Sequence, residues 1–463
     1  MLAIINHKQQ FIMEAIDQVQ NLSPLDGRYF SKTKSLRDYF SEYALIKYRT
    51  QVEIEWLLTL SESTEIDCIN PFSNTISGKL RKIYQDFQPA DALKVKTIES
   101  KTNHDVKAVE YYIADLLEKE GLSEVIPMLH FACTSEDINN LAYGLMLKHS
   151  MDSVIIPACK SLKNHISDKA ETYRNIPLLS KTHGQPASPT TLGKEFFNVV
   201  ARFDRQINQI KNQSILGKIN GAVGNFNAHF ASYPKADWAS ISQKFVESLG
   251  LSWNPTTTQI EPHDYMAELF HQMIRWNNIV LDLDRDIWLY ISIGVFKQKP
   301  VEGEVGSSTM PHKVNPIDFE NSEGNLGLAN AIFDHLAIKL PISRWQRDLS
   351  DSTVQRNIGV AFGYSVLAYQ STLKGLSKLA VDEKYISAEL SQAWPVLGEA
   401  LQTVMRRYKI PDSYEKLKAL TRGKQIDQQS IQAFIQSLDL PADVKKELME
   451  LKPETYIGNA NLF

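Results

Sequence analysis

One long stretch decides the fold class: residues 262–300, PHDYMAELFHQMIRWNNIVLDLDRDIWLYISIGVFKQKP, which contain no proline between their two ends. The large apolar residues of this stretch recur at steps of three or four positions: Met266, Leu269, Met273, Trp276, Val280, Leu283 and Ile287. Such spacing places them on one stripe of an α-helix. The stretch therefore predicts a single helix of many turns that buries one face against neighbouring helices.

Two further stretches point the same way. A second apolar stripe consists of Leu192, Phe196, Val199, Phe203, Ile207 and Ile210, and a third proline-free stretch lies between Pro341 and Pro395. Alternating patterns typical of strands are hard to find. Short runs such as Glu124–Met128 fit a strand or a loop, and periodicity does not decide between them. We predict an all-α protein with three helical domains: residues 1–121, a central bundle of long helices over residues 122–379, and residues 380–463.

Composition narrows the class of function. The chain has 463 residues and a formal net charge of -4, which gives no electrostatic footprint for DNA or RNA. Its longest basic cluster, Arg406-Arg407-Tyr408-Lys409, fits a helix end better than a binding patch. Three widely spaced cysteines without a CxxC pair favour a reducing compartment. The sequence contains no run of about 18 apolar residues, so it predicts no membrane-spanning helix. Residues 1–22 lack the apolar middle region of a signal peptide. We expect a cytoplasmic protein, with Met1 or Met13 as its start.

The segment richest in chemistry is Gly303–Pro316, GEVGSSTMPHKVNP. Its glycines, serines and prolines make it a poor helix and a good loop. Hydroxyl, ammonium and amide groups together could hold carboxylates, and loops on rigid scaffolds often carry function. A plain polar loop between helices fits these residues equally well.

This loop resembles the GSSxMPxKxNP pattern of the fumarase/aspartase superfamily. The histidine at position 312 is similar to two branches, the carboxymuconate cycloisomerases and the branch that releases fumarate from succinylated purine nucleotides. The continuation Ile317–Asn325, IDFENSEGN, resembles the second of these branches. The resemblance implies three helical domains, four chains that pool their long helices, and active sites that each take residues from three chains. It implies no metal and no organic cofactor.

A second block is Lys181–Ala187, KTHGQPA. Alone, its histidine fits a turn or core position. The block resembles the THGQPA form of the superfamily, which implies that His183 is the general acid and that Ser307 in the loop is the base. The unperturbed pKa of imidazole lies nearest neutrality, so His183 suits proton transfer to a leaving nitrogen.

A third block is Thr102–Ala108, TNHDVKA, and a fourth is TSED at Thr134–Asp137. Each fits a helix start, with Asn103 or Asp105 as the cap of the first. They also resemble motifs of the superfamily that contact substrate. Hydroxyls and N–H groups at a helix start suit a carboxylate.

The resemblance implies a larger set of substrate-binding residues, spread over the chain. They are Arg28, Tyr29, Asn103, His104, Asp105, Thr134, Ser135, Gln259, Ser308, Lys313, Val314, Asn315, Asn321, Arg347, Ser352, Thr353, Val354, Gln355 and Arg356. Arginines and hydroxyls are the chemistry expected for a phosphate monoester. Without the resemblance, Arg28 would be interpreted as a surface charge. Of the whole set, Gln355 is the residue with the least support as a ligand.

Some patterns do not carry a function. Gly217, Gly221 and Gly224 lack a preceding strand and the spacing of a nucleotide fingerprint, and fit the end of the long helix and a turn. No HExxH or cysteine–histidine grouping predicts zinc. His263-Asp264 is rejected as a dyad because adjacent residues point in different directions on a helix. The alternatives that stay open are another branch of the superfamily, such as the carboxymuconate cycloisomerases, and a non-catalytic structural protein on the same scaffold. The expected partners are nucleotide substrates and copies of this chain, with no nucleic acid and no membrane.

Overall fold

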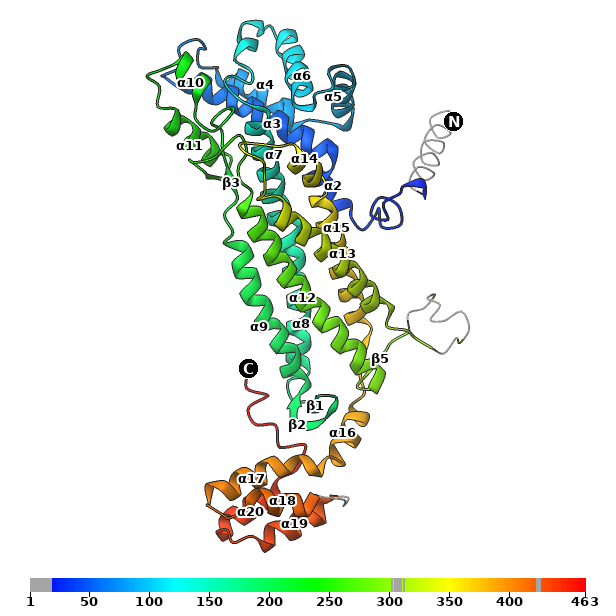
Figure 1. The fold of residues 1–463 in the computed structure, drawn as a ribbon. Coiled ribbons are helices and arrows are strands. Elements are labelled where there is room, and N and C mark those ends of the chain that lie inside the picture. Colours follow the sequence, from blue (N-terminus) through cyan, green and yellow to red (C-terminus); the bar gives the residue numbers. More distant parts are fainter. Residues whose placement is uncertain (1–18, 301–302, 304–309, 311–312, 422–425) are drawn as a thin grey trace. The chain divides into compact units, whose positions relative to one another are not determined.

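A computed structural model describes residues 19–300, 303, 310, 313–421 and 426–463. Helices dominate these residues, joined by three pairs of short strands (Figure 1). The described residues divide into two compact units. Unit 1 comprises the chain up to Cys159, Gln206–Asn278 and Gly324–Tyr369, and unit 2 comprises Lys160–Arg205, Ile279–Glu323 and Gln370–Phe463. The predicted all-α fold class is confirmed.

Unit 1 begins with η1 (Lys34–Leu36), α2 (Arg37–Phe40), α3 (Glu42–Glu62), α4 (Asn74–Gln85), α5 (Pro89–Thr102), α6 (Asp105–Lys119), η2 (Ser123–Met128), α7 (Ser135–Ser150) and the π-helix η3 (Met151–Ile155). Its later elements are the paired strands β3 (Leu216–Gly217) and β4 (Ser252–Trp253), with α10 (Asn227–Ser232), α11 (Trp238–Ser248) and α14 (Ser350–Gln355). Helix α7 is buried over nearly its whole length and packs along α3. Polar residues on α7 therefore lie inside the unit and need partners there.

Five long helices have residues in both units. They are α8 (Ile156–Thr172), α9 (Leu192–Lys211), α12 (Asp264–Ile293), α13 (Ile317–Lys339) and α15 (Ile358–Ser377). The predicted stripe of α12 is buried, since none of its seven apolar residues is more than 5% exposed. The stripe of α9 is buried as well. Both sequence predictions of long amphipathic helices are confirmed.

Unit 2 adds a hairpin of β1 (Pro177–Thr182) and β2 (Gln185–Thr191), the antiparallel pair β5 (Phe296–Gln298) and β6 (Leu379–Val381), and a C-terminal set of helices. That set is α16 (Glu383–Ser391), η4 (Trp394–Leu397), α17 (Gly398–Arg407), α18 (Ser413–Thr421), α19 (Gln428–Ser437) and α20 (Ala442–Glu450). Helices α17 to α20 gather around one small core that includes Leu401, Met405 and Ile435 (Figure 1). Arg406-Arg407 end α17, as the sequence predicted.

The structure corrects three local expectations. Residues 124–128 form neither a strand nor a loop but most of the 3₁₀-helix η2. Helix α9 ends at Lys211, so the glycines do not end it: Gly217 lies in β3, whereas Gly221 and Gly224 turn the chain with φ of 83° and 81°. The hairpin β1–β2 was not predicted at all, because prolines at 177, 186 and 189 hide its alternation. The boundaries at Gly121 and Leu379 stay predictions.

Candidate active site

Arg28 and Tyr29 lie in a series of turns that precedes α2. The backbone N–H of Tyr29 donates to the carbonyl of Pro24 at 2.8 Å, and the Thr33 hydroxyl donates to the carbonyl of Leu25 at 3.0 Å. Tyr29 is half-buried and Arg28 is exposed, with its guanidinium carbon 5.8 Å from the Tyr29 ring centre. The turns are tied to one another, and the arginine extends from them into solvent.

Arg356 follows α14 and meets two carboxylates. Its guanidinium lies 2.6 Å from Glu42 Oε2 and 3.1 Å from Asp105 Oδ2. The buried Arg49 on α3 reaches the same Asp105 oxygen at 2.8 Å. Burial alone would raise the pKa of Asp105, but the two guanidinium groups hold it below its usual value. Arg356 also lines a cavity of about 350 Å³ together with Ser23, Arg37 and Ser41.

Arg347 is held by a second set of partners. Its guanidinium lies 2.9 Å from Glu136 Oε1 in the first turn of α7, and it donates to the Gln259 side-chain oxygen at 3.3 Å. The amide of Gln259 in turn donates to the carbonyl of Ala222 at 2.9 Å. Arg347 and Gln259, both predicted as substrate ligands, are therefore neighbours, and both line a cavity of about 430 Å³.

A buried polar chain joins these two arginine sites. The Asn139 amide donates to Glu136 Oε1 at 2.7 Å and accepts from Arg49 Nε at 2.8 Å. Arg347, Glu136, Asn139, Arg49, Asp105 and Arg356 therefore form one continuous network inside unit 1. Sequence analysis did not select Arg49, Glu136 or Asn139, because a local pattern does not show which distant residues become partners.

The helix starts supply backbone donors. Thr134 caps α7 in a capping box with Asp137, whose carboxylate accepts from the Thr134 N–H at 2.8 Å. Ser135 begins the helix and is half-buried. The capping interpretation of TSED is therefore confirmed, whereas its contact with substrate stays a prediction.

The cap of α6 differs from the prediction. His104 is the cap, and its Nδ1 accepts from the Lys107 N–H at 3.1 Å. Asn103 instead ends α5 in the left-handed region, with φ of 51°. Asp105 is the first residue of α6, and its side chain serves the arginine network. The other Asp105 oxygen accepts from the Val106 N–H at 2.9 Å, so this carboxylate also contacts the start of α6.

The run Ser352–Arg356 is only partly available to a ligand. Thr353 and Arg356 are exposed, and Ser352 and Val354 are half-buried. Gln355 is buried, with its amide nitrogen 3.5 Å from His263 Nε2. Of the five, Gln355 is the one turned towards the interior.

His263 pairs with acids other than its neighbour Asp264. It precedes α12 with φ of 66°, is fully buried, and lies 3.6 Å from Asp351 Oδ2 and 4.0 Å from Glu261 Oε2. Burial alone would raise the pKa of Asp351, but His263 and Arg347 lower it below its usual value. His263 and Asp264 do not form a dyad, as the sequence analysis concluded. The reason given there, that adjacent residues diverge on a helix, does not apply, because His263 lies before the first residue of α12.

Unit 2 carries the remaining described candidates. His183 lies at the tip of the hairpin, where Thr182 pairs with Gln185 and the two residues between them have positive φ, 53° at His183 and 74° at Gly184. Positive φ at both central residues is typical of a type I′ turn, in which glycine is favoured at the second of the two positions. His183 is exposed, so the turn interpretation of its sequence was right and the core interpretation was wrong.

Lys313, Val314, Asn315 and Asn321 surround the start of α13. Lys313 and Val314 are exposed, Asn315 is half-buried, and the Asn321 side-chain oxygen accepts from the Ser371 hydroxyl at 2.8 Å. Ser307 and Ser308 lie outside the described residues.

One group of described side chains has the composition of a metal site: Glu53, Glu110 and His130 in unit 1. His130 Nδ1 lies 2.6 Å from Glu53 Oε1, and the Lys107 ammonium lies 2.6 Å from Glu110 Oε2. Burial would lower the pKa of His130, but the bond to Glu53 raises it above its usual value. Both acids therefore already have a partner from the chain itself, Glu53 in His130 and Glu110 in Lys107. Among the described residues, no helix is both long and apolar enough to cross a membrane.

Comparisons with known proteins identify the class. Residues 27–331 match a family model described as Lyase, and residues 343–457 match one described as Adenylosuccinate lyase C-terminal. A 3-carboxy-cis,cis-muconate lactonizing enzyme from Pseudomonas putida has a similar fold, with a TM-score of 0.70 at 19% identity over 93% of this chain and 95% of that one. A fumarate lyase from Mesorhizobium has a TM-score of 0.71 at 15% identity, over 93% and 96%. Fold and family model together define a lyase of the fumarase/aspartase superfamily.

Closer relatives narrow the family. The chain is 57% identical to the adenylosuccinate lyase of Haemophilus influenzae over 95% of this chain and 96% of that one. It is 58% identical to the enzyme named adenylosuccinate lyase in Vibrio cholerae, over 95% and 97%, and 57% identical to that of Escherichia coli, over 95% and 96%. The chain belongs to the adenylosuccinate lyase family.

Proposed function

We propose that the chain eliminates fumarate from adenylosuccinate, which gives AMP, and from SAICAR, its imidazole-carboxamide counterpart, which gives AICAR. The observation that carries this proposal is the 57–58% identity to curated adenylosuccinate lyases over 95% of the chain. The match of residues 343–457 to the C-terminal model of the same family supports it over a carboxymuconate cycloisomerase.

In the proposed reaction Ser307 is the base and His183 is the acid. The base removes a proton from the carbon beside a succinyl carboxylate, and the electron pair left behind spreads into that carboxylate. It then forms the double bond of fumarate as the carbon–nitrogen bond breaks. The nitrogen leaves with the bonding electrons and takes a proton from His183. An exposed imidazole on a defined turn suits this step, because a general acid must reach the leaving atom.

Lys313 and Asn315 are proposed to hold the succinyl carboxylates, and Arg28, Arg356 and Ser352 the nucleotide phosphate. A guanidinium offers paired N–H donors that fit a phosphate. Arg356 is exposed while its carboxylate partners hold it in one place, which supports this role. Binding energy at the phosphate would then position the reacting carbon.

The remaining proposed ligands are assigned by motif. Tyr29, Asn103, His104, Asp105, Thr134, Ser135, Gln259, Ser308, Val314, Asn321, Arg347, Thr353, Val354 and Gln355 complete the proposed substrate site. We further propose a cytoplasmic homotetramer whose active sites each take residues from three chains, with nucleotides as substrates and no cofactor.

An ultraviolet assay of the purified protein tests the reaction. Adenylosuccinate and SAICAR are supplied side by side, and fumarate, AMP and AICAR are measured. We expect both substrates to be cleaved with one fumarate for each nucleotide product. If no fumarate forms from either substrate, the chain is a non-catalytic member of the family. If carboxymuconate is cyclised instead, the substrate assignment is wrong.

A further inference from the structure

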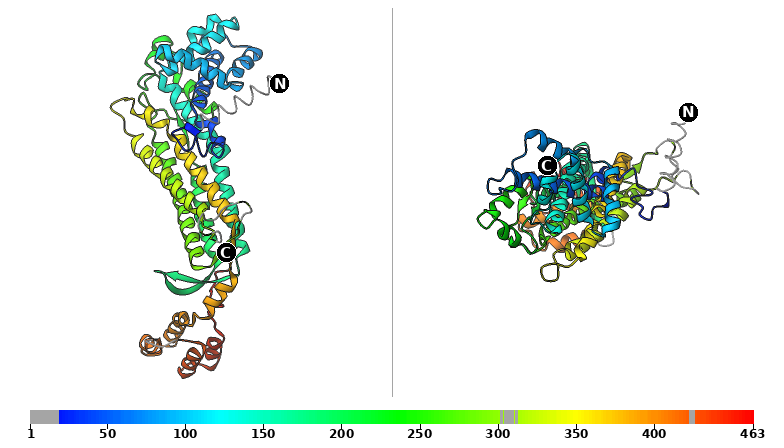
Figure 2. Two further views of the ribbon diagram at one scale, coloured as in Figure 1. Left: turned by 90° about the vertical axis from the view of Figure 1, so that its right-hand side faces the viewer. Right: turned by 90° about the horizontal axis from the view of Figure 1, so that it is seen from above.

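The segment that carries His183 needs support from outside itself. Residues 182–186 are exposed, and Figure 2 shows the hairpin β1–β2 extending from the helices of unit 2 as a two-stranded arm. Its ladder also contains an irregularity between Leu179 and Lys181. An isolated two-stranded ribbon is marginally stable in water. The direction of His183 therefore depends on the groups that hold the arm.

Strand β1 is held by α16. The Lys181 ammonium, two residues before His183, lies 2.5 Å from Glu389 Oε1. Both side chains are only about a quarter exposed, at 25% and 22%. A partly buried pair of this kind is screened less by solvent than a surface pair. It fixes the arm close to its tip.

Strand β2 is held by α17. The Ser188 hydroxyl donates to Glu399 Oε2, and the Tyr456 hydroxyl donates to the same oxygen at 3.1 Å. One carboxylate thus joins the hairpin, α17 and the segment that follows α20. The two strands of the arm are held by acidic residues from two different helices.

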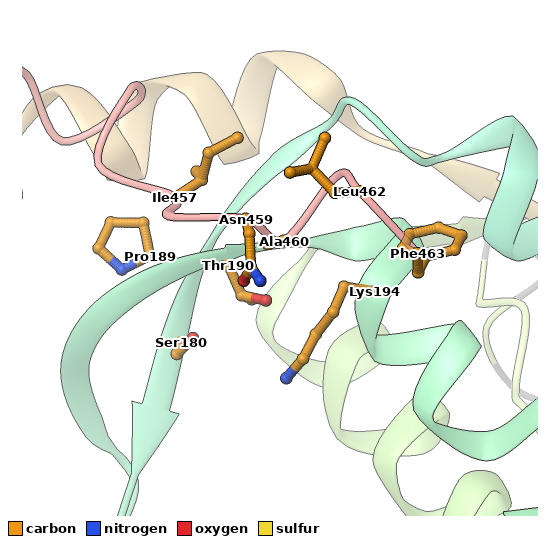
Figure 3. A pocket seen from close by; sticks show the side chains of 9 residues that line it. All are labelled: Ser180, Pro189, Thr190, Lys194, Ile457, Asn459, Ala460, Leu462 and Phe463. Carbon is orange, nitrogen blue, oxygen red and sulfur yellow. The ribbon is translucent and has the colours of Figure 1, made fainter. Parts of the chain in front are cut away.

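The base of the arm rests on residues 457–463. The Thr191 hydroxyl donates to the carbonyl of Ala460 at 3.0 Å, and Phe463 stacks on Phe197 of α9 with ring centres 4.4 Å apart. Figure 3 shows this segment running past Pro189 and Thr190, with a cavity of about 470 Å³ between them. The arm therefore has a fixed base as well as two fixed strands.

We infer that Glu389 and Glu399 are positioning residues for the general acid: through Lys181 and Ser188 they set the direction in which the hairpin presents His183. The inference rests on the proposed role of His183. Neither carboxylate needs to touch substrate, because a displacement of about 1 Å at a reacting group costs on the order of 100-fold in rate. The C-terminal helices would thus contribute to catalysis through the hairpin alone.

The first test is Glu389→Gln, which keeps the shape of the side chain and removes its charge. We expect kcat for adenylosuccinate to fall about tenfold or more, with KM within about twofold, because the acid is misplaced while the substrate still binds. Glu399→Gln should act in the same direction. Asp204→Asn is the matched control, since it removes an exposed ion pair with Lys163 elsewhere in unit 2 and should leave kcat unchanged. The charge-reversed pair Lys181→Glu with Glu389→Lys should recover part of the lost kcat.

The second test repeats Glu389→Gln in a His183→Ala background. A residue that acts only through His183 has nothing left to position, so the second substitution should cause no further loss. An equal loss in both backgrounds would show that Glu389 merely stabilises the fold and would overturn the inference. A wild-type kcat in both Glu389→Gln and Glu399→Gln would overturn it too. If His183→Ala itself turns over at the wild-type rate, the assignment of the acid in the proposed function fails instead. Should Glu389→Gln fail to fold, Lys181→Met and Glu399→Gln carry the same two tests.

Discussion

Arg356 shares its guanidinium between Glu42 and Asp105 and still faces solvent, so a phosphate would compete with carboxylates already in place. Arg356→Met should raise KM for adenylosuccinate about 10- to 100-fold, the range expected for loss of charge-assisted hydrogen bonds. The fall in kcat should be smaller, because the phosphate is remote from the reacting carbon. Steady-state kinetics with both substrates measures the effect.

Lys79→Met is a suitable control for Arg356, since it removes an exposed ion pair with Glu120 in the same unit. Its kinetics should match those of the unmodified protein. An Arg356→Met variant whose KM is also unchanged would remove this arginine from the phosphate site.

The roles of Ser307 and His183 separate by isotope exchange. Ser307→Ala should abolish turnover, because it removes the base that forms the carbanion. His183→Ala should retain almost no turnover, because the nitrogen would have to leave without a proton. General acid–base help is worth about 10²–10⁴-fold in rate. In heavy water, the His183 variant should still exchange the succinyl proton, whereas the Ser307 variant should not. Exchange by Ser307→Ala at the wild-type rate would show that another residue is the base.

At the scale of elements, the unit 2 portions of three long helices meet at a buried carboxyl group. Asp284 on α12 is 1% exposed and accepts from the Thr372 hydroxyl of α15 at 3.0 Å, and Thr372 contacts Ser322 of α13 at 2.8 Å. Burial raises the pKa of Asp284 to about 8. The folded protein therefore keeps a proton on this group near neutral pH.

That proton gives the stability a defined dependence on pH. The pKa of an unfolded aspartate is about 3.9. The contribution of Asp284 to folding is thus fully present below about pH 4 and is lost as the pH rises towards 8, at up to about 1.4 kcal/mol per pH unit. Asp284→Asn imitates the protonated form at every pH. Thermal melts should show similar stability at pH 4 and a variant that is more stable than the unmodified protein at pH 8. Parallel curves across this range would contradict the prediction.

The helices of this protein are readable from its sequence, and the hairpin is not. The stripe from Met266 to Ile287 fixes α12 because a period near 3.6 repeats over many turns. The strand Gln185–Thr191, QPASPTT, offers no such repeat, and the acidic residues that contact the hairpin lie about 200 residues further along the chain. Local patterns carry no information on such partners.

The site divides in the same way. Motif resemblance selected Arg347, Arg356 and Asp105, and the structure brings them into one network. It did not select Arg49 or Glu136, which connect them. An arginine within an apolar helix such as α3 could have been noticed as a buried charge in need of partners. Which partners it has depends on residues 56 and 90 positions further along the chain.

At the scale of the whole molecule, the proposed shared sites predict complementation between inactive chains. Ser307→Ala and His183→Ala chains are mixed, dissociated and reassembled. If the two residues of a site come from different chains, up to about a quarter of the sites regain both, since each position has an even chance of being intact. Activity per tetramer measures the recovery. Mixed tetramers that stay inactive would contradict shared sites.

Because unit 1 consists of three separate segments of the chain, its parts are synthesised at different times. Unit 1 draws its parts from before residue 159, from 206–278 and from 324–369, with segments of unit 2 between them. The first of these parts leaves the ribosome about 210 residues before the last, which at roughly 5–20 residues per second is a wait of about 10 to 40 s. Throughout that interval the apolar faces of α3 and α7 lack part of their eventual cover. We therefore expect a newly made chain to expose apolar surface while it waits, and this exposure arises from chain order alone.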